Sequence, residues 1–289
     1  MKKSIGLLIV LFVSELFCGC AMFSPASMLS EYFKKVKLSI VGQEDPELIR
    51  QGVPTLIILL DAAVAQDPDN SDLLRSASTM YATYAQAFMV SNGEIKRAAV
   101  QYKRAKDYAM RLLNKRSFYA KIADAPFDDF EKVLLKFDKG DVPDLYAAGN
   151  AWLGWILTNT SSMEALSELP RALAIMKRVM ELDDSYADGG VHLVFGIYYA
   201  VQPPGAGRDL KKSKEHFLRA IELGGEKNLL PKVTYAEFYL TAAGDEKAFD
   251  QMLESVVNAG ETDDPEYVLI NAIAKERAKK LIENKDEYF

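Results

Sequence analysis

The sequence is poor in cysteine and histidine, the side chains that form disulfide bonds and bind many metal ions. Only two of its 289 residues are cysteine and two are histidine. Both cysteines, Cys18 and Cys20, lie near the N-terminus, so no disulfide can staple the domain that follows. Such a domain has to rely on a large hydrophobic core, which this length allows. A formal net charge of −6 also argues against nucleic-acid binding, which requires a basic face.

Motifs of common enzymes are absent as well. The sequence has no His-Glu-x-x-His pair, no Gly-x-Ser-x-Gly turn and no Gly-x-x-x-x-Gly-Lys loop. His192 and His216 each fall within a predicted helix, where a structural or surface role is commoner than catalysis. The segment from Asp67 to Asp72 begins like a calcium loop but lacks its glycine and final glutamate, so a helix N-cap explains it better. We expect no enzyme, metal or cofactor. A hydrolase, the alternative, would need a desolvated carboxylate pair beside one of the histidines.

What the N-terminus does contain is an export signal. Two lysines precede an apolar run over residues 5–17, and Gly19 stands before Cys20. The run is too short to cross a bilayer, which takes about 20 apolar residues. Its end resembles the lipobox of bacterial lipoproteins, in which the cysteine after a small residue is acylated. We expect residues 1–19 to be removed and Cys20 to carry the lipid, which anchors a periplasmic protein to the inner or outer membrane of a Gram-negative or spirochaete-like bacterium. Plain secretion with a free cysteine is the alternative.

A lipidated tether, residues 20–45, is predicted to follow the signal. It contains a short basic amphipathic stretch from Tyr32 to Lys37. This stretch either contacts anionic lipid headgroups or forms a first helix that packs on the domain, and the second interpretation is favoured. Residues 46–289 then make up one domain. Apolar residues recur there at three- and four-residue steps, which predicts helices throughout.

Four divergent repeats within this domain follow the pattern of the tetratricopeptide helical hairpin. A small residue in the first helix of each unit allows close approach, and large residues fill the grooves between hairpins. The spacing is irregular, and an insertion occupies residues 116–145. We predict an all-α, tetratricopeptide-like stack of about eleven or twelve helices, closed by a C-terminal capping helix near residues 265–284. The four small residues are Ser78, Gly154, Gly196 and Ala236.

In such a stack the first helix of each hairpin lines the concave face. Two lining positions per unit can be counted from the small residue. The resulting set is mixed and lightly charged, which suits a neutral or amphipathic small molecule better than an acidic peptide. Its members are Thr79, Thr83, Trp155, Asn159, Ile197, Val201, Glu237 and Thr241.

Aromatic residues of the last two units extend this candidate site. Aromatic side chains at helical spacing are more often core than ligand contacts, but tyrosine hydroxyls need partners when buried, which favours the edge of a polar channel. A neighbouring loop would form the rim of the channel. The alternative is that Trp155, Ile197 and these rings only fill the core. The aromatic candidates are Tyr198, Tyr199, Tyr235, Phe238 and Tyr239, and the rim candidates are Gln202, Pro203, Pro204 and Gly205.

The most distinctive motifs resemble those of a known family. They lie between His192 and Tyr239 and are Phe195-Gly196-x-Tyr198-Tyr199, Pro203-Pro204-x-x-Gly207 and Tyr235-Ala236-x-x-Tyr239. Together with the sequence around Trp152-Leu153-Gly154-Trp155, they are similar to the T component of TRAP transporters, the TatT-like lipoproteins. The similarity extends over roughly residues 45–280.

This resemblance implies a periplasmic, lipid-anchored accessory protein that forms a homotrimer with a pore or cavity in each protomer. It also implies association with the solute-binding (P-type) component of a TRAP transporter, and a small hydrophobic or organic-acid ligand. The family has no catalytic residues to carry over. The alternative function is a tetratricopeptide scaffold for protein–protein assembly at the cell envelope, without a small ligand.

Overall fold

The protein folds into helices joined by short loops. The computed structural model describes residues 25–120, 125–205 and 207–289, and in these segments it contains helices and no strand. The predicted signal sequence, residues 1–19, and Cys20 lie outside the described residues. The all-α prediction is confirmed.

Helices α2 to α7 make up the first part of the fold. After α4 the chain passes without a break through a π-helical segment, η2, and a 3-10 turn, η3, before it reverses. The bounds are α2 (Pro25–Val41), α3 (Pro46–Gln66), α4 (Ser71–Tyr84), η2 (Ala85–Met89), η3 (Val90–Asn92), α5 (Ile95–Asn114), α6 (Ser117–Ala120) and α7 (Phe127–Leu134).

Helices α8 to α16 make up the rest. A second π-helical segment, η5, joins α13 and α14 into one continuous element. The bounds are η4 (Lys139–Asp141), α8 (Val142–Leu157), α9 (Met163–Ser167), α10 (Leu169–Leu182), α11 (Tyr186–Val201), α12 (Leu210–Gly224), α13 (Leu230–Thr234), η5 (Tyr235–Leu240), α14 (Thr241–Ala243), α15 (Glu246–Val257), α16 (Val268–Glu283) and η6 (Lys285–Glu287).

Short polar side chains cap the helix starts. The Asn70 side chain accepts hydrogen bonds from the backbone N–H groups of Asp72 and Leu73, at 3.1 and 3.2 Å, and so begins α4. Asp45 caps α3 in the same way, with Pro46 at the first helical position. These bonds satisfy N–H groups that have no partner inside the helix. The N-cap interpretation of the segment from Asp67 to Asp72 is therefore confirmed.

The four predicted repeats correspond to packed helix pairs. These pairs are α4 with α5, α8 with α10, α11 with α12, and the α13–η5–α14 element with α15. At Gly196 on α11 a Cβ atom would collide with the ring of Phe217 on α12, and Ser213 Oγ donates to the Gly196 carbonyl at 2.8 Å. A side chain at Gly154 would likewise collide with Tyr102 of the preceding pair. The small residues thus permit the close approach that the pattern predicts.

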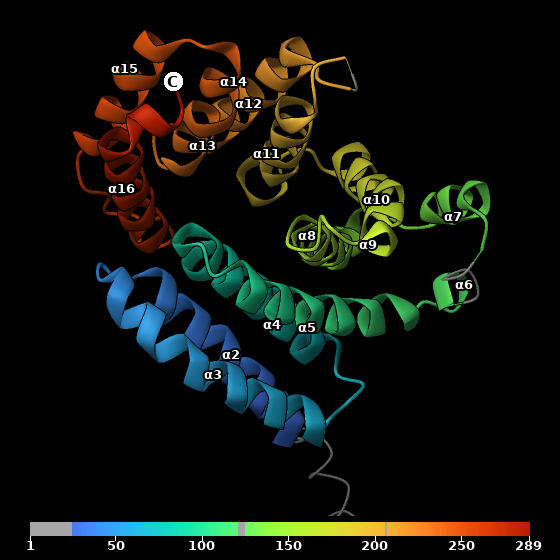
Figure 1. The fold of residues 1–289 in the computed structure, drawn as a ribbon. Helices are drawn as coiled ribbons and strands as arrows, with labels where there is room; N and C mark the ends of the chain where they lie inside the picture. Colours follow the sequence, from blue (N-terminus) through green and yellow to red (C-terminus); the bar gives the residue numbers. More distant parts are fainter. Residues whose placement is uncertain (1–24, 121–124, 206) are drawn as a thin grey trace, which may run out of the picture.

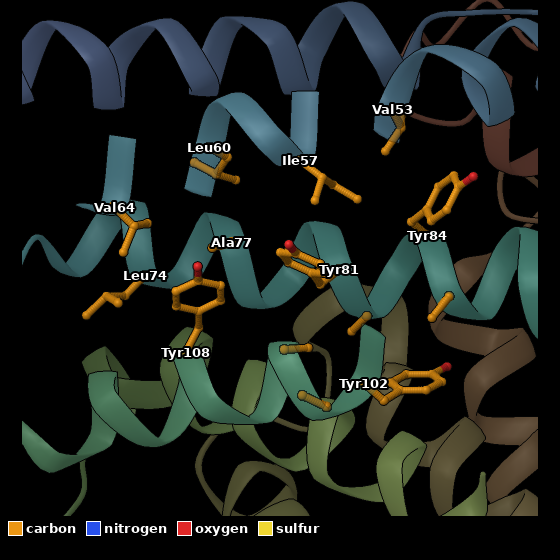
Figure 2. Packing of buried hydrophobic residues seen from close by; sticks show 14 of the residues in the cluster. Val53, Ile57, Leu60, Val64, Leu74, Ala77, Tyr81, Tyr84, Tyr102 and Tyr108 are labelled. Carbon is orange, nitrogen blue, oxygen red and sulfur yellow. The ribbon is translucent and has the colours of Figure 1, made fainter. Parts of the chain in front are cut away.

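The pairs follow a curve, and α2 and α3 form an outer layer beneath α4 and α5 (Figure 1). The predicted C-terminal helix is α16, which packs on α15 and also contacts α2 and α3. The C-terminal helix therefore packs on the first two helices of the described chain. Figure 2 shows the packing at this layer: Val53 and Ile57 of α3 lie beside Tyr81 and Tyr84 of α4.

The basic stretch of the predicted tether belongs to a helix that packs on the domain. Phe33 of α2 is 4% exposed and joins the same core cluster as Ile49 and Val53 of α3. The structure therefore supports the interpretation of this stretch as a first helix. Its lysines remain exposed to solvent.

The insertion predicted at residues 116–145 is packed on the molecule over its described part, residues 116–120 and 125–145. Phe130 and Phe137 are fully buried beneath α10. Arg178 of α10 donates hydrogen bonds to the carbonyl oxygens of Leu135 and Phe137, at 3.3 and 2.7 Å. These contacts fasten α7 to the second hairpin, since the carbonyl groups at a helix end otherwise have no partner.

Candidate functional site

The predicted aromatic residues lie on two elements that pack together with α12: Tyr198 and Tyr199 on α11, and Tyr235, Phe238 and Tyr239 on η5. The Tyr198 and Tyr199 rings lie 5.2 Å apart and edge to face, and the Tyr235 and Tyr239 rings stack at 4.9 Å. Phe217 of α12 contacts Tyr235 and so bridges the two hairpins. We call Tyr198, Tyr199, Tyr235, Phe238 and Tyr239 the aromatic face.

The tyrosine hydroxyl groups of this face are not engaged in hydrogen bonds with other described side chains or backbone groups. Among the described residues none hydrogen-bonds with the hydroxyls of Tyr198, Tyr199, Tyr235 or Tyr239. None of these oxygens is both buried and unpaired, so they reach solvent. Burial of the ring raises the pKa of Tyr235 to about 12, so its phenol stays protonated. The face therefore offers apolar rings edged by free hydroxyl donors.

Both histidines of the chain lie beside the aromatic face and contact each other. His192 Nδ1 is 2.9 Å from His216 Nδ1, and the His216 ring stacks on Phe195 and Tyr199 at 5.4 and 5.8 Å. Burial lowers the pKa of both imidazoles, and for His216 the neighbouring His192 lowers it further. Two neutral rings that share one hydrogen bond fit this geometry.

The carboxylate beside His192 is that of Asp184, 3.4 Å from Nε2. The Arg219 guanidinium binds the same carboxylate at 3.0 and 3.2 Å, and this bond holds the pKa of Asp184 below its usual value. Asp184 is thus committed to an ion pair. The hydrolase alternative required a pair of desolvated carboxylates beside a histidine. The carboxylate beside His192 is instead paired with the Arg219 guanidinium.

Glu237, predicted as a lining residue, is held by the C-terminal helix. Its Oε2 lies 2.5 Å from Nη2 of Arg277 on α16, and the two side chains are 19% and 23% exposed. Burial raises the pKa of the Glu237 carboxyl, and the Arg277 charge opposes this shift. Sequence reasoning missed Arg277 because no local spacing links α16 to η5.

Trp155 belongs to a second cluster of side chains, which gathers around the ammonium group of Lys106 at the second hairpin. The ammonium of Lys106 lies 4.0 Å from the centroid of the Trp155 ring and 4.8 Å from that of Trp152. Glu168 closes the group, because it pairs with Lys106 and accepts a hydrogen bond from Trp152 Nε1 at 2.5 Å. Lys106 lies on α5 and Glu168 in the turn between α9 and α10, so their role could not be read from the spacing.

The remaining predicted residues are spread over the first three helix pairs. Thr79, Thr83 and Val201 are exposed, and Ile197 is half-buried. Asn159 lies two residues after the end of α8, and its side chain donates to the Trp155 carbonyl at 2.7 Å. The rim residues 202–205 lead from α11 toward α12, and the Asp209 backbone N–H donates to the carbonyl of Tyr199 at 3.1 Å. The rim therefore adjoins the aromatic face, whereas Thr79, Thr83, Trp155 and Asn159 lie on other hairpins.

Two hollows of the described surface lie elsewhere. One, of about 410 Å³, lies between α7 and α10, with Asp128, Leu135 and Glu181 on its wall. The other, of about 400 Å³, is lined by Asp61, Tyr81 and Arg104, among others. Neither contains a residue that the sequence predicted as lining.

The fold and these groups define a class: an all-helical protein of packed helix pairs that carries an aromatic face. The model of the family TRAP transporter T-component matches residues 42–289. The chain belongs to this family, which makes it an accessory component of TRAP transport. A protein of Treponema pallidum (strain Nichols), described as uncharacterized, is 21% identical over 262 residues, which cover 86% of this chain and 81% of that protein.

Proposed function

We propose that the protein binds a small amphipathic ligand on the aromatic face and presents it to the solute-binding component of a TRAP transporter. The observation that carries this proposal is that four tyrosine hydroxyls beside packed rings have no hydrogen-bond partner among the described residues. Apolar rings with a few polar groups at their edge match the composition of small-molecule sites. Family membership supports the transport role.

The ligand class follows from the side chains that surround the face. The rings accept a hydrophobic body, and the phenol hydroxyls donate to a polar head such as a carboxylate. Lys212 lies 5.3 Å from the Tyr199 ring and Lys214 lies 6.0 Å from that of Tyr239, so both ammonium groups border the face. A medium- or long-chain organic acid would satisfy all three elements.

Localisation and assembly complete the proposal. An acyl chain on Cys20 would hold the protein at the periplasmic side of a membrane, where the solute-binding component works. Assembly as a homotrimer, with a pore or cavity in each protomer, would place three aromatic faces in one particle. These features rest on the lipobox-like sequence and on the family resemblance.

Ligand binding can be tested with a fluorescent undecanoic acid as the probe. The double variant Tyr198→Ala/Tyr239→Ala should bind the probe at least tenfold more weakly than the wild-type protein, because it removes two rings and two donors. Met163→Ala serves as the control, since Met163 is 81% exposed on α9 and does not belong to the aromatic face. Equal affinity of all three proteins would rule out the aromatic face as the binding site.

A separate experiment tests the partner. Protein solubilised from membranes and captured by a C-terminal tag should bring down a periplasmic solute-binding protein, identified by mass spectrometry. Recovery of envelope-assembly proteins alone would favour the scaffold alternative. One observation already favours that alternative: neither hollow is lined by the predicted residues.

A further inference from the structure

The outward side of α3 is almost free of charge. Between Gln51 and Gln66 the sequence has a single charged residue, Asp61. Its carboxylate accepts hydrogen bonds from Tyr81 at 2.8 Å and Tyr108 at 2.6 Å, so it faces inward. Leu48, Ile58 and Leu59 are instead 55%, 69% and 52% exposed. Soluble surfaces rarely leave such a stripe uncovered.

The neighbouring helix α2 adds to this surface. Tyr32 and Leu38 are 54% and 60% exposed on it. Lys35 and Lys37 are exposed there too, whereas Lys34 pairs with Asp72 of α4 at 3.0 Å. We call Tyr32, Leu38, Leu48, Ile58 and Leu59 the α2–α3 face. Together with Lys35 and Lys37 it combines large apolar side chains with cations on flexible stems, a composition typical of helices that lie in a membrane interface.

Helix α3 does not need to cross a membrane to use this face. By length and composition it could span a bilayer. However, Val53, Ile57, Leu60 and Val64 on its inward side are buried in the core beside α4 (Figure 2). Only the outward half of the helix is available to lipid.

The position of the predicted anchor indicates the occupant. Helix α2 begins at Pro25, so four residues separate it from Cys20. Five residue steps span at most about 18 Å even when fully extended. An acyl chain on Cys20 would therefore keep the start of α2 within the thickness of the headgroup layer and its adjoining water.

We propose that the α2–α3 face rests on the surface of the lipid bilayer. Its apolar side chains enter the headgroup boundary, and the Lys35 and Lys37 ammonium groups contact lipid phosphates. Glu47, in the first turn of α3, does not oppose this contact, because it is paired with Arg50 at 2.5 Å. This proposal rests on lipidation of Cys20, which belongs to the proposed function.

The test uses the full chain, processed in a bacterial host and reconstituted in vesicles of phosphatidylcholine with a minority of phosphatidylglycerol. Processing removes Cys18 and acylates Cys20, so Ile58→Cys introduces a single free thiol for an environment-sensitive fluorophore. Lipids brominated near the headgroup should quench this label at least threefold more than a label at Leu218→Cys. Leu218 is 47% exposed on α12 and provides the matched control. Adding Leu59→Glu to Ile58→Cys should reduce the quenching.

The outcomes separate the anchor from the surface. Mass spectrometry of the N-terminal peptide reports acylation directly. Acylated protein whose labels at residues 58 and 218 are quenched equally would overturn the α2–α3 face while leaving the anchor intact. A label at residue 58 that responds to protein density and not to brominated lipid would assign the face to a second copy and also overturn the proposal. Absence of acyl chains on Cys20 would refute the anchor and the proposal together.

Discussion

Single glycines decide how closely the helix pairs approach. Gly154 of α8 faces the ring of Tyr102, which is 2% exposed and hydrogen-bonded to Gln86 at 2.6 Å. Close-packed interiors have little room to shift, so even one methyl group at such a contact has to displace a ring.

Gly154→Ala should therefore destabilise the protein by about 1–3 kcal/mol, the usual cost of overpacking a core. Urea unfolding followed by circular dichroism measures this change. Gly52→Ala on α3 is the control, because nothing lies within 4 Å of a Cβ atom there. We expect that control to be neutral or slightly stabilising, since alanine favours helix more than glycine does. Equal losses in both variants would contradict the packing account.

The histidine pair makes stability depend on pH. Burial lowers the pKa of both His192 and His216 in the folded protein, so the unfolded chain binds their protons more readily. Their contribution is fully present above the unfolded-state pKa of about 6.5 and is lost as the pH falls through the folded-state values. The melting temperature of the wild-type protein should therefore fall between pH 7 and pH 5 more steeply than that of His192→Gln/His216→Gln. Parallel pH profiles would show that the pair is not titrating in this range.

At the scale of elements, the periodicity of the sequence predicted most helices but not their tertiary partners. The pairs containing Gly196 and Gly154 were predictable because a small residue and a large ring recur at repeat spacing. The contact of Arg178 with α7 was not predictable, since it joins carbonyl groups about 40 residues away in the sequence. Likewise, Lys106 meets Trp155 only because α5 packs on α8. Such polar contacts have no period in the sequence.

Arg178 provides the prediction for the inserted element. Arg178→Met keeps the apolar stem but removes the donors to Leu135 and Phe137, and unpaired carbonyl groups cost about 1–3 kcal/mol when buried. We expect faster amide hydrogen exchange over residues 127–137 and little change in α11 and α12. Uniform acceleration across the molecule would instead indicate that the insertion unfolds together with the whole domain.

At the scale of the whole molecule, α16 ties the last hairpin to the first helices. The half-buried ion pair of Arg277 and Glu237 connects α16 to η5 of this hairpin. Arg277→Leu leaves Glu237 without its cation, which typically costs about 3–5 kcal/mol for a buried pair. The double variant Arg277→Leu/Glu237→Leu should recover most of that loss, because no charge remains buried. Thermal unfolding of the three proteins checks this, and equal losses in the single and double variants would contradict it.

The family and the curvature of the array follow from the sequence, whereas the surroundings of the candidate site do not. The tyrosines of the aromatic face were identified by their spacing, and the structure places one ring pair on α11 and the other on η5. That Glu237 is covered by α16 depends on closure of the molecule, which no local pattern encodes. The predicted lining residues of the first two hairpins, on α4 and at α8, lie on other helices than the aromatic face, and the repeat pattern alone did not separate them from it.

Photo-crosslinking tests the central claim, a guest held on the aromatic face, most directly. Protein reconstituted in vesicles is irradiated with a diazirine-bearing long-chain acid, and the labelled peptides are mapped by mass spectrometry. The account predicts labelling concentrated on residues 193–205 and 230–243, with competition by unlabelled acid. Label confined to α2 and α3, or spread evenly and insensitive to competitor, would contradict it.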